Sequence, residues 1–329
     1  MLQTFNEYEH FIEAVGHADA KFTLPRLEIP FWSIFQREVG KIHLQASAEG
    51  SSNIAEASTL GSGYLLFAQR IGAACYANGV PLRDDMLLAS GPKGEFVIAS
   101  EGAHEWYSIF VPTALMTMPG MPEEDLLIGQ GTSRVLRPNQ QALQKLHSIV
   151  DRLQQVDRNT PESFLEPASV ASAERELVRT IRGFLGPPQS SSTAAGAIEA
   201  MARSAGLRGR PALERDRVIK KVLDRIDQNP AELPTVEQLA STLDVSERTL
   251  RTMFVEFFGM SPTKYLHVRG LNRVRQTLLL PGAGDVTIAR VAARFGFWDF
   301  GRFARQYRQL FGELPSATLR KSGRFRKLP

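Results

Sequence analysis

The chain has a single cysteine, Cys75, among its 329 residues. One cysteine cannot form a disulfide within the chain, which favours a reducing compartment. No run of 18 apolar residues occurs, and the first ten residues, MLQTFNEYEH, lack the charged-then-apolar order of a signal peptide. The sequence therefore predicts a soluble, cytoplasmic protein with no membrane partner.

Clustered metal ligands and nucleophiles are also missing. His43 and the His104–Glu105 pair stand apart from the other histidines, whereas a transition-metal site needs several nitrogen and oxygen ligands together. The Gly-Ser-Gly segment at 61–63 is too short for a phosphate-binding loop and is typical of a turn. We therefore expect no catalytic residue, no metal, no cofactor and no enzymatic activity.

Charge is distributed unevenly along the chain. Residues 201–329 contain 24 Lys and Arg against 12 Asp and Glu, whereas residues 1–200 contain 15 against 23. The overall net charge of +4 thus hides a basic C-terminal part and an acidic N-terminal part. This division is expected of a module that binds a polyanion joined to one that does not.

The segment GFWDFGRFARQYRQLFGELP, residues 296–315, combines six aromatic residues with three arginines. Phe303, Tyr307, Leu310 and Phe311 recur at the three-and-four spacing of one helix face, which we expect to be buried. Asp299 is placed to cap this helix, and Gly312 and the residues around it to end it. The spacing predicts an amphipathic helix whose arginines face outward.

The same pattern occurs a second time, earlier in the chain. TVEQLASTLDVSERTLRTMFVEFFGMSP aligns with TIARVAARFGFWDFGRFARQYRQLFGELP once one residue is inserted into the second segment. The apolar positions correspond 52 residues apart before the insertion and 53 after it. Each copy predicts a short helix, a tight turn and a longer capped helix, which is the helix-turn-helix pattern.

Both copies, with the helix between them, resemble the DNA-binding domain of AraC/XylS transcription regulators. The second copy carries the resemblance: Gly296-Phe297, then Phe303, Arg305 and Tyr307, then Phe311-Gly312 with Pro315. The similarity covers about residues 211–322. Trp298 and Phe300 depart from it, because the family more often has small or polar residues there; we expect these rings to pack on a neighbouring helix rather than on a sugar of DNA.

The resemblance and the helix faces together predict which residues contact double-stranded DNA. Base-reading residues are expected on the outer faces of the two longer helices: Glu247, Arg248, Arg251, Thr252, Gly301, Arg302 and Arg305. Phosphate contacts are expected from Arg217, Lys220, Lys221, Lys264, Arg269, Arg273, Arg275 and Arg308. The alternative for about half of the phosphate set is simple solvated charge.

The helix between the two units sets their separation. Eighteen residues, 263–280, span about 27 Å as a helix, and successive major-groove faces lie roughly 34 Å apart. We therefore expect one monomer to contact two successive segments of major groove.

The N-terminal part has a β texture, with short apolar segments broken by turns from Phe22 to Val111. A small barrel or sandwich is expected, and the resemblance implies a cupin-like ligand-binding barrel. The mouth of a barrel is a natural site for a small molecule. The aromatic residues that line such a site, if they are not plain core, are Trp32, Phe35, Phe67, Phe96 and Trp106.

Two helices are expected between the barrel and the DNA-binding part, at about 138–185. In the first, Leu143, Leu146, Val150 and Leu153 form a narrow apolar seam. The seam predicts either packing on the barrel or a homodimer contact, and the family resemblance favours the dimer. Residues 186–210, with a Gly-Pro-Pro-Gln and Ser/Thr run, are typical of a linker.

The predicted fold is α+β with two domains. Residues 1–185 form a β-barrel or sandwich with strands at about 20–130 and flanking helices, and 211–325 form an all-α domain with helix-turn-helix units at about 235–258 and 287–311. The predicted function is a ligand-responsive transcription activator that contacts RNA polymerase, the latter by analogy with the family. The alternatives are a regulator controlled by abundance or a protein partner, and an enzyme in the barrel with a DNA-addressing domain.

Overall fold

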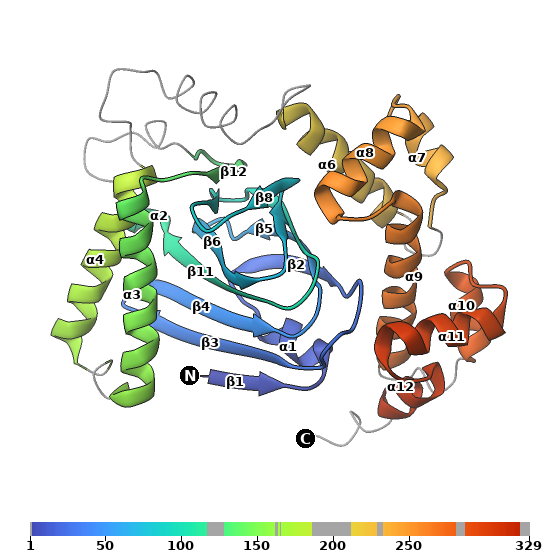
Figure 1. Ribbon diagram of the computed structural model, residues 1–329, viewed down its shortest axis with the longest axis horizontal. Helices are drawn as coiled ribbons and strands as arrows, with labels where there is room; N and C mark the ends of the chain where they lie inside the picture. Colours follow the sequence, from blue (N-terminus) through green and yellow to red (C-terminus); the bar gives the residue numbers. More distant parts are fainter. Residues whose placement is uncertain are drawn as a thin grey trace.

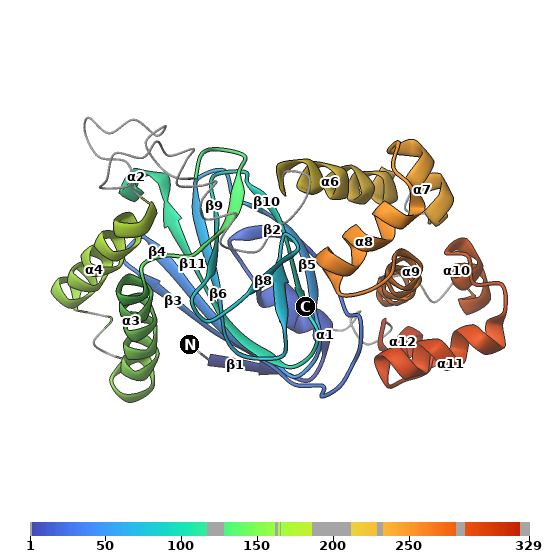
Figure 2. The same ribbon diagram turned by 45° about the horizontal axis from the view of Figure 1, so that its top comes forward.

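The computed structural model describes residues 2–116, 128–161, 164, 166–185, 212–228, 233–280 and 287–322. The β-structure occupies the centre, with two helices on one side and the C-terminal helices on the opposite side (Figures 1 and 2). The predicted linker, 186–210, lies outside the described residues. The α+β fold with an N-terminal β-domain and a C-terminal helical domain is therefore confirmed.

The N-terminal domain contains two antiparallel sheets. The seven-stranded sheet has the order β1-β3-β4-β11-β6-β9-β12, with bounds Leu2–Phe5, Trp32–Val39, Ile42–Glu49, His104–Pro112, Gly63–Gly72, Leu87–Ser90 and Ser133–Leu136. The five-stranded sheet has the order β2-β5-β10-β7-β8, with bounds Ala18–Thr23, Ile54–Thr59, Glu95–Ser100, Cys75–Ala77 and Val80–Leu82. The strands therefore extend beyond the expected range, to residue 2 at one end and to residue 136 at the other.

The five-stranded sheet is covered on both faces, because side chains alternate along each strand. In β5, Ala55 and Ala57 belong to the core between the sheets, whereas Ile54 packs with the first helix-turn-helix unit. In β10, Phe96 and Ile98 face the inner core and Val97 faces the helices. This sheet is thus a shared wall between the interior of the β-domain and the C-terminal domain.

Helices α3 (Gln140–Asn159) and α4 (Pro167–Leu185) cover the seven-stranded sheet on the side away from the C-terminal domain (Figure 1). The four residues of the predicted dimer seam, Leu143, Leu146, Val150 and Leu153, are 0–5% exposed and lie in this core. The dimer interpretation of this seam is wrong, because the strands of the same chain and α4 already cover its apolar face. The described residues of this domain also include two short helices, α1 (Tyr8–Ala14) and α2 (Thr113–Met116).

The described residues of the C-terminal domain form helices and the turns between them. Its helices are α6 (Ala212–Gln228), α7 (Val236–Thr242), α8 (Glu247–Phe258), α9 (Pro262–Leu279), α10 (Ile288–Arg294), α11 (Phe300–Phe311) and α12 (Pro315–Ser322). α7 with α8 and α10 with α11 form two helix-turn-helix units, and α9 joins them (Figure 1).

Capping residues define both units. Thr235 and Gln238 form a reciprocal capping box at the start of α7, and Thr287 caps α10. α8 and α11 end at Gly259 and Gly312, both in the left-handed conformation that favours glycine. These local signals explain why the two units are recognisable from sequence.

Candidate nucleic-acid interface

The outer face of α8 is exposed and polar. The apolar face of α8 is buried and consists of Leu250, Met253, Phe254 and Phe257. The predicted base-reading residues are exposed to solvent on the other face: Glu247, Arg248, Arg251 and Thr252. Arg251 donates to Glu247 at 3.0 Å, with side chains 63% and 47% exposed. A pair this exposed contributes at most about 1 kcal/mol, so a DNA base can compete for Arg251.

α11 presents a corresponding surface. Its apolar residues Phe303, Tyr307, Leu310 and Phe311 are buried, as predicted from their spacing, and Gly301, Arg302 and Arg305 are exposed. A Cβ added to Gly301 would contact nothing nearer than Asp299 Oδ1, at 3.6 Å. Packing within the protein therefore does not require glycine at this position.

The turn of the second unit is one residue longer than that of the first. Ser246 and Asp299 are equivalent N-caps, because each side chain accepts a hydrogen bond from the backbone N–H three residues later. Residues 243–246 separate α7 from α8, whereas 295–299 separate α10 from α11. The alignment of these caps makes Trp298 the additional residue.

Trp298 is 75% exposed, and Phe300, the first residue of α11, is 45% exposed. The expectation that these rings pack on a neighbouring helix is therefore wrong. Residue type alone does not indicate their exposure, because aromatic residues are usually buried. The available signal was the position of Trp298 as the additional residue of the turn before α11.

A basic groove of about 630 Å³ lies between α6 and α8. Arg217 and Lys221 of α6 line it together with Arg248 and Thr252 of α8. The fold thus brings two expected phosphate contacts next to two expected base-reading residues, over a separation of about 30 residues in sequence.

The remaining expected phosphate contacts divide into two groups. Lys264 and Arg308 are exposed. Lys220 is exposed but forms an ion pair with Glu95 of β10 at 2.6 Å. The three arginines of α9, Arg269, Arg273 and Arg275, instead form ion pairs with carboxylates of the protein.

Arg269 is 5% exposed and forms ion pairs with Glu56 of β5 and, at 2.7 Å, with Asp227 of α6. Burial by itself lowers the pKa of Arg269, but Tyr265 and Glu56 raise it above its ordinary value, so the guanidinium stays charged. Arg273 donates to Asp227 at 2.9 Å. The prediction that Arg269 contacts phosphate is therefore wrong, because carboxylates of the protein already bind its guanidinium. Arg273 likewise forms an ion pair with Asp227.

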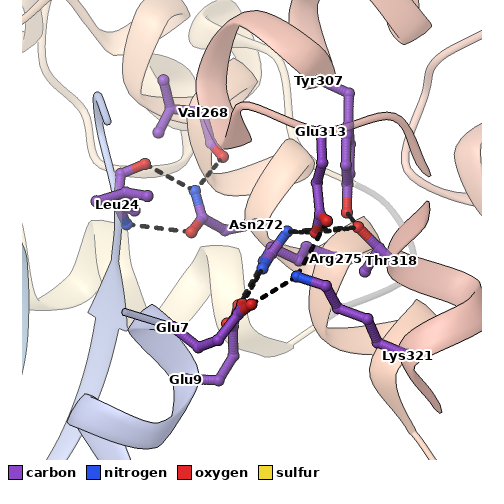
Figure 3. Close-up of polar contacts among 10 residues, drawn as sticks. All are labelled: Glu7, Glu9, Leu24, Val268, Asn272, Arg275, Tyr307, Glu313, Thr318 and Lys321. Atoms are coloured by element: carbon purple, nitrogen blue, oxygen red, sulfur yellow. Dashed lines mark hydrogen bonds and ion pairs between the residues drawn. The ribbon is translucent and has the colours of Figure 1, made fainter. Parts of the chain in front are cut away.

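Arg275 is the centre of a second buried cluster (Figure 3). It is 6% exposed and contacts Glu9 of α1 at 2.5 Å and Glu313, before α12, at 2.6 Å. Lys321 joins this cluster through Glu7, at 2.7 Å, and Glu313, at 3.0 Å. The phosphate role predicted for Arg275 is therefore also wrong here, because acidic residues of the N-terminal domain occupy its donors.

Asn272 lies one helical turn from Arg269 and Arg275 and binds the N-terminal domain through its amide (Figure 3). Its Oδ1 accepts from the Leu24 N–H at 3.1 Å, and its Nδ2 donates to the Leu24 carbonyl at 3.0 Å. The charged and hydrogen-bonding side chains of Arg269, Asn272 and Arg275 on α9 thus connect the two domains. Sequence reasoning could not separate them from DNA contacts, because both uses require the same residue types.

A cavity of about 60 Å³ lies between the two sheets. Phe67, Phe96 and Trp106 line it, but Trp32 and Phe35 do not. Phe35 belongs to the core beneath α3 and α4, because alternation along β3 turns it away from Trp32 and Ile34. The predicted ligand set is therefore wrong for Phe35, and Trp32 is core.

Glu49 forms the polar end of this cavity. Its carboxylate accepts from Trp106 Nε1 at 2.6 Å and from Asn53 Nδ2 at 3.1 Å, and His104 Nε2 lies 3.8 Å away. Burial raises the pKa of Glu49, while His104 opposes this rise. The cavity therefore combines an apolar wall with the buried carboxylate of Glu49.

A helix-turn-helix domain model matches residues 239–321. XylDLEGF operon transcriptional activator 2 of Pseudomonas putida is 39% identical over 119 residues, which are 36% of this chain and 72% of that protein. The chain belongs to the AraC/XylS family of transcription regulators.

Two further relatives match over a similar share of the chain. XylDLEGF operon transcriptional activator 1 of P. putida is 37% identical over 114 residues, covering 35% of this chain and 33% of that protein. The probable thc operon regulatory protein of Rhodococcus erythropolis is 32% identical over 103 residues, covering 31% of each. The chain thus spans about a third of the length of these two relatives, and the relatives named here are regulators and not enzymes.

Solved structures of AraC-type proteins are also similar. The AraC-like transcriptional activator CuxR is 11% identical, with a TM-score of 0.39 over 84% of this chain and 95% of that one. An AraC-type regulator from Chromobacterium violaceum is 24% identical, with a TM-score of 0.31 over 33% of this chain and 96% of that one.

Within the described part of the chain, no group of three or more His, Cys, Asp or Glu residues is placed to hold a metal ion. No helix in the same residues is long and apolar enough to cross a bilayer.

Proposed function

We propose that this AraC/XylS regulator recognises DNA sequence with both helix-turn-helix units, so that one monomer contacts two successive major-groove segments. The observation that carries the proposal is the exposure of Arg248 and Arg251 on α8 and of Arg302 and Arg305 on α11. Each of these faces lies opposite a buried apolar face of its own helix. Arginine pairs with the two acceptors of guanine in the major groove.

Binding of selected duplexes tests this proposal. The 329-residue chain is used to enrich sequences from a random duplex pool. Hydroxyl-radical footprinting is then carried out on the best sequence. Two protected segments about one helical turn apart are expected for each monomer. A single short protected segment would contradict two-unit reading, and a pool without enrichment would contradict sequence-specific binding.

We also propose that a small effector binds the cavity between the sheets. The support is its composition: an apolar wall that includes Phe67 and Phe96, with Glu49 and His104 at one end. Such a cavity suits a small, mostly apolar molecule with one hydrogen-bond donor directed at Glu49.

The shared wall offers a physical route from this cavity to the DNA-binding domain. Ala55 and Ala57 of β5 line the cavity, whereas Glu56 between them pairs with Arg269 of α9. An effector changes the position of α9 if it binds competing arrangements of β5 unequally. Displacement of β5 by the effector would therefore be transmitted to the helix that joins the two units.

A thermal-shift screen of wild type and Glu49→Gln against a metabolite panel tests the effector site. A compound that binds the cavity raises the melting temperature of wild type and has less effect on Glu49→Gln. An equal shift in both proteins would place the compound elsewhere.

The small volume of the cavity, about 60 Å³, favours a second candidate, a regulator without a small-molecule effector. Control would then come from abundance or a protein partner. A metabolite panel that shifts neither protein, together with sequence-specific binding by the ligand-free protein, would support this candidate.

The relatives' names include transcriptional activators, and we propose activation through RNA polymerase as the outcome of binding. We also propose a homodimer, with an interface that does not include the apolar seam of α3. Transcription in vitro from a promoter carrying the selected sequence tests activation, and sedimentation of the full chain with and without DNA tests the dimer.

A further inference from the structure

The N-terminal end of α11 carries an aromatic surface that is largely exposed to solvent in the described fold. Trp298 is 75% exposed and Phe300 is 45% exposed. The neighbouring Phe297 and Phe303 behave differently, since they pack against each other with ring centroids 5.3 Å apart. Phe297 and Phe303 therefore pack with the core, whereas Trp298 and Phe300 remain exposed to solvent.

The first unit has no counterpart of this surface. The N-cap and first residue of α8 are Ser246 and Glu247, whereas α11 begins with Asp299 and Phe300. Trp298 has no equivalent in the shorter turn before α8. The two units therefore offer different chemistry at the same place: hydrogen-bonding groups in the first and apolar rings in the second.

The position of these rings indicates their partner. In helix-turn-helix proteins the N-terminal residues of the second helix approach the base edges in the major groove. Arg302 and Arg305, on the first two turns of α11, are exposed and give this end a positive charge. The exposed rings of Trp298 and Phe300 lie beside exposed arginines. This combination complements the major groove, which presents the apolar C5-methyl group of thymine and is flanked by phosphates.

We propose that Trp298 and Phe300 contact thymine methyl groups in the second major-groove segment, so that the second unit selects A·T pairs beside the bases contacted by Arg302 and Arg305. This inference rests on the proposed two-unit reading of DNA. It makes the specificity of the two segments unequal: polar recognition in the first, and mixed apolar and polar recognition in the second.

The test uses the full chain and the best duplex selected from a random pool. Each thymine of the duplex is replaced in turn by uracil, which removes the C5-methyl and keeps base pairing. Uracil at a contacted position of the second segment is expected to weaken wild-type binding about fourfold, the effect of losing one buried methyl group. Uracil in the first segment has less effect.

Variants assign this methyl dependence to the rings. Trp298→Ala is expected to bind the thymine duplex more weakly than wild type does, by a similar factor. The variant should bind the uracil duplex as tightly as it binds the thymine duplex, because its contact with the methyl group is already gone. Trp298→Phe keeps part of the dependence. Leu314→Ala is the matched control, since Leu314 is 45% exposed in the same unit but lies beyond the C-terminal end of α11; it keeps wild-type behaviour.

Several results would overturn the inference. These are selected sequences without thymine in the second segment, wild-type binding insensitive to uracil, or the same uracil effect in wild type and Trp298→Ala. Wild-type DNA binding by Trp298→Ala with loss of transcription in vitro would assign the rings to a protein contact instead. Failure of the two-unit proposal is distinct, because it appears as a missing second footprint with wild-type protein.

Discussion

Glu56 of β5 and Arg269 of α9 form a buried ion pair across the interface between the β-domain and the DNA-binding domain. The two residues are 213 positions apart in sequence, and their side chains are 8% and 6% exposed. A buried charge is costly unless it is paired. The pair therefore favours one arrangement of the domains, and it occupies an arginine that would otherwise be available to DNA.

Glu56→Gln is expected to lower the free energy of unfolding by about 3 kcal/mol, because Arg269 keeps its charge in the interface with Asp227 as its remaining carboxylate partner. Urea denaturation measures this change, and limited proteolysis reports loosening of the interface. Lys21→Ala is the control: Lys21 also pairs with Asp227, but its side chain is 66% exposed, so its loss costs at most about 1 kcal/mol. Equal effects of the two variants would show that burial of the pair is unimportant.

The dependence of stability on pH provides a second prediction. Asp216 of α6 faces a cavity between α6 and the five-stranded sheet, and burial raises its pKa from 3.8 to about 7. A carboxyl whose pKa is raised on folding favours the folded state when protonated, so its contribution is present below about pH 4 and is lost as pH rises to about 7.

Asp216→Asn is therefore expected to be more stable than wild type at pH 8, by about 2–4 kcal/mol, and close to wild type at pH 4. Urea denaturation at both pH values measures the difference. Asp224→Asn, at an exposed position of the same helix, is the control and should show a small effect at both. A constant difference between Asp216→Asn and wild type across this range would contradict the assignment.

Base and phosphate contacts differ in what their loss does to specificity. Arg251→Ala and Arg305→Ala should each relax sequence preference at one position and cost about 1–3 kcal/mol on the selected duplex. Lys264→Ala should weaken binding to all duplexes alike and reduce the salt slope by about one. Competition with mutated duplexes over a salt series measures both. Equal losses on every sequence for all three variants would refute the division into two classes.

The α3 seam predicts an effect on folding rather than on assembly. Leu146 and Val150 are 0% and 2% exposed, so changing both to Asp places unpaired carboxyls in the core and costs well over about 4 kcal/mol. Circular dichroism should show loss of folded protein. Gln144→Asp, on the exposed side of α3, should leave the fold intact. A folded monomer from the double variant would restore the dimer interpretation.

Local sequence features were enough to recognise the two helix-turn-helix units. Leu250 and Phe254, or Phe303 and Tyr307, recur within one helix, and the caps Ser246 and Asp299 lie beside the turns that they define. Periodicity and capping act over a few residues, so they can be identified without knowledge of the tertiary fold. The exposed faces of α8 and α11 follow directly from these buried positions.

The sequence by itself thus determined the helical repeat, its basic outer faces and the β-rich character of the N-terminal part, because each depends on short-range order or on composition. Tertiary structure alone decided that Arg269 and Arg275 pair with carboxylates, that the α3 seam is core, and that Trp298 is exposed. A guanidinium can pair with a phosphate or with a carboxylate, and an apolar stripe can pack on any apolar partner. Which partner is met depends on chain segments that lie far away in sequence.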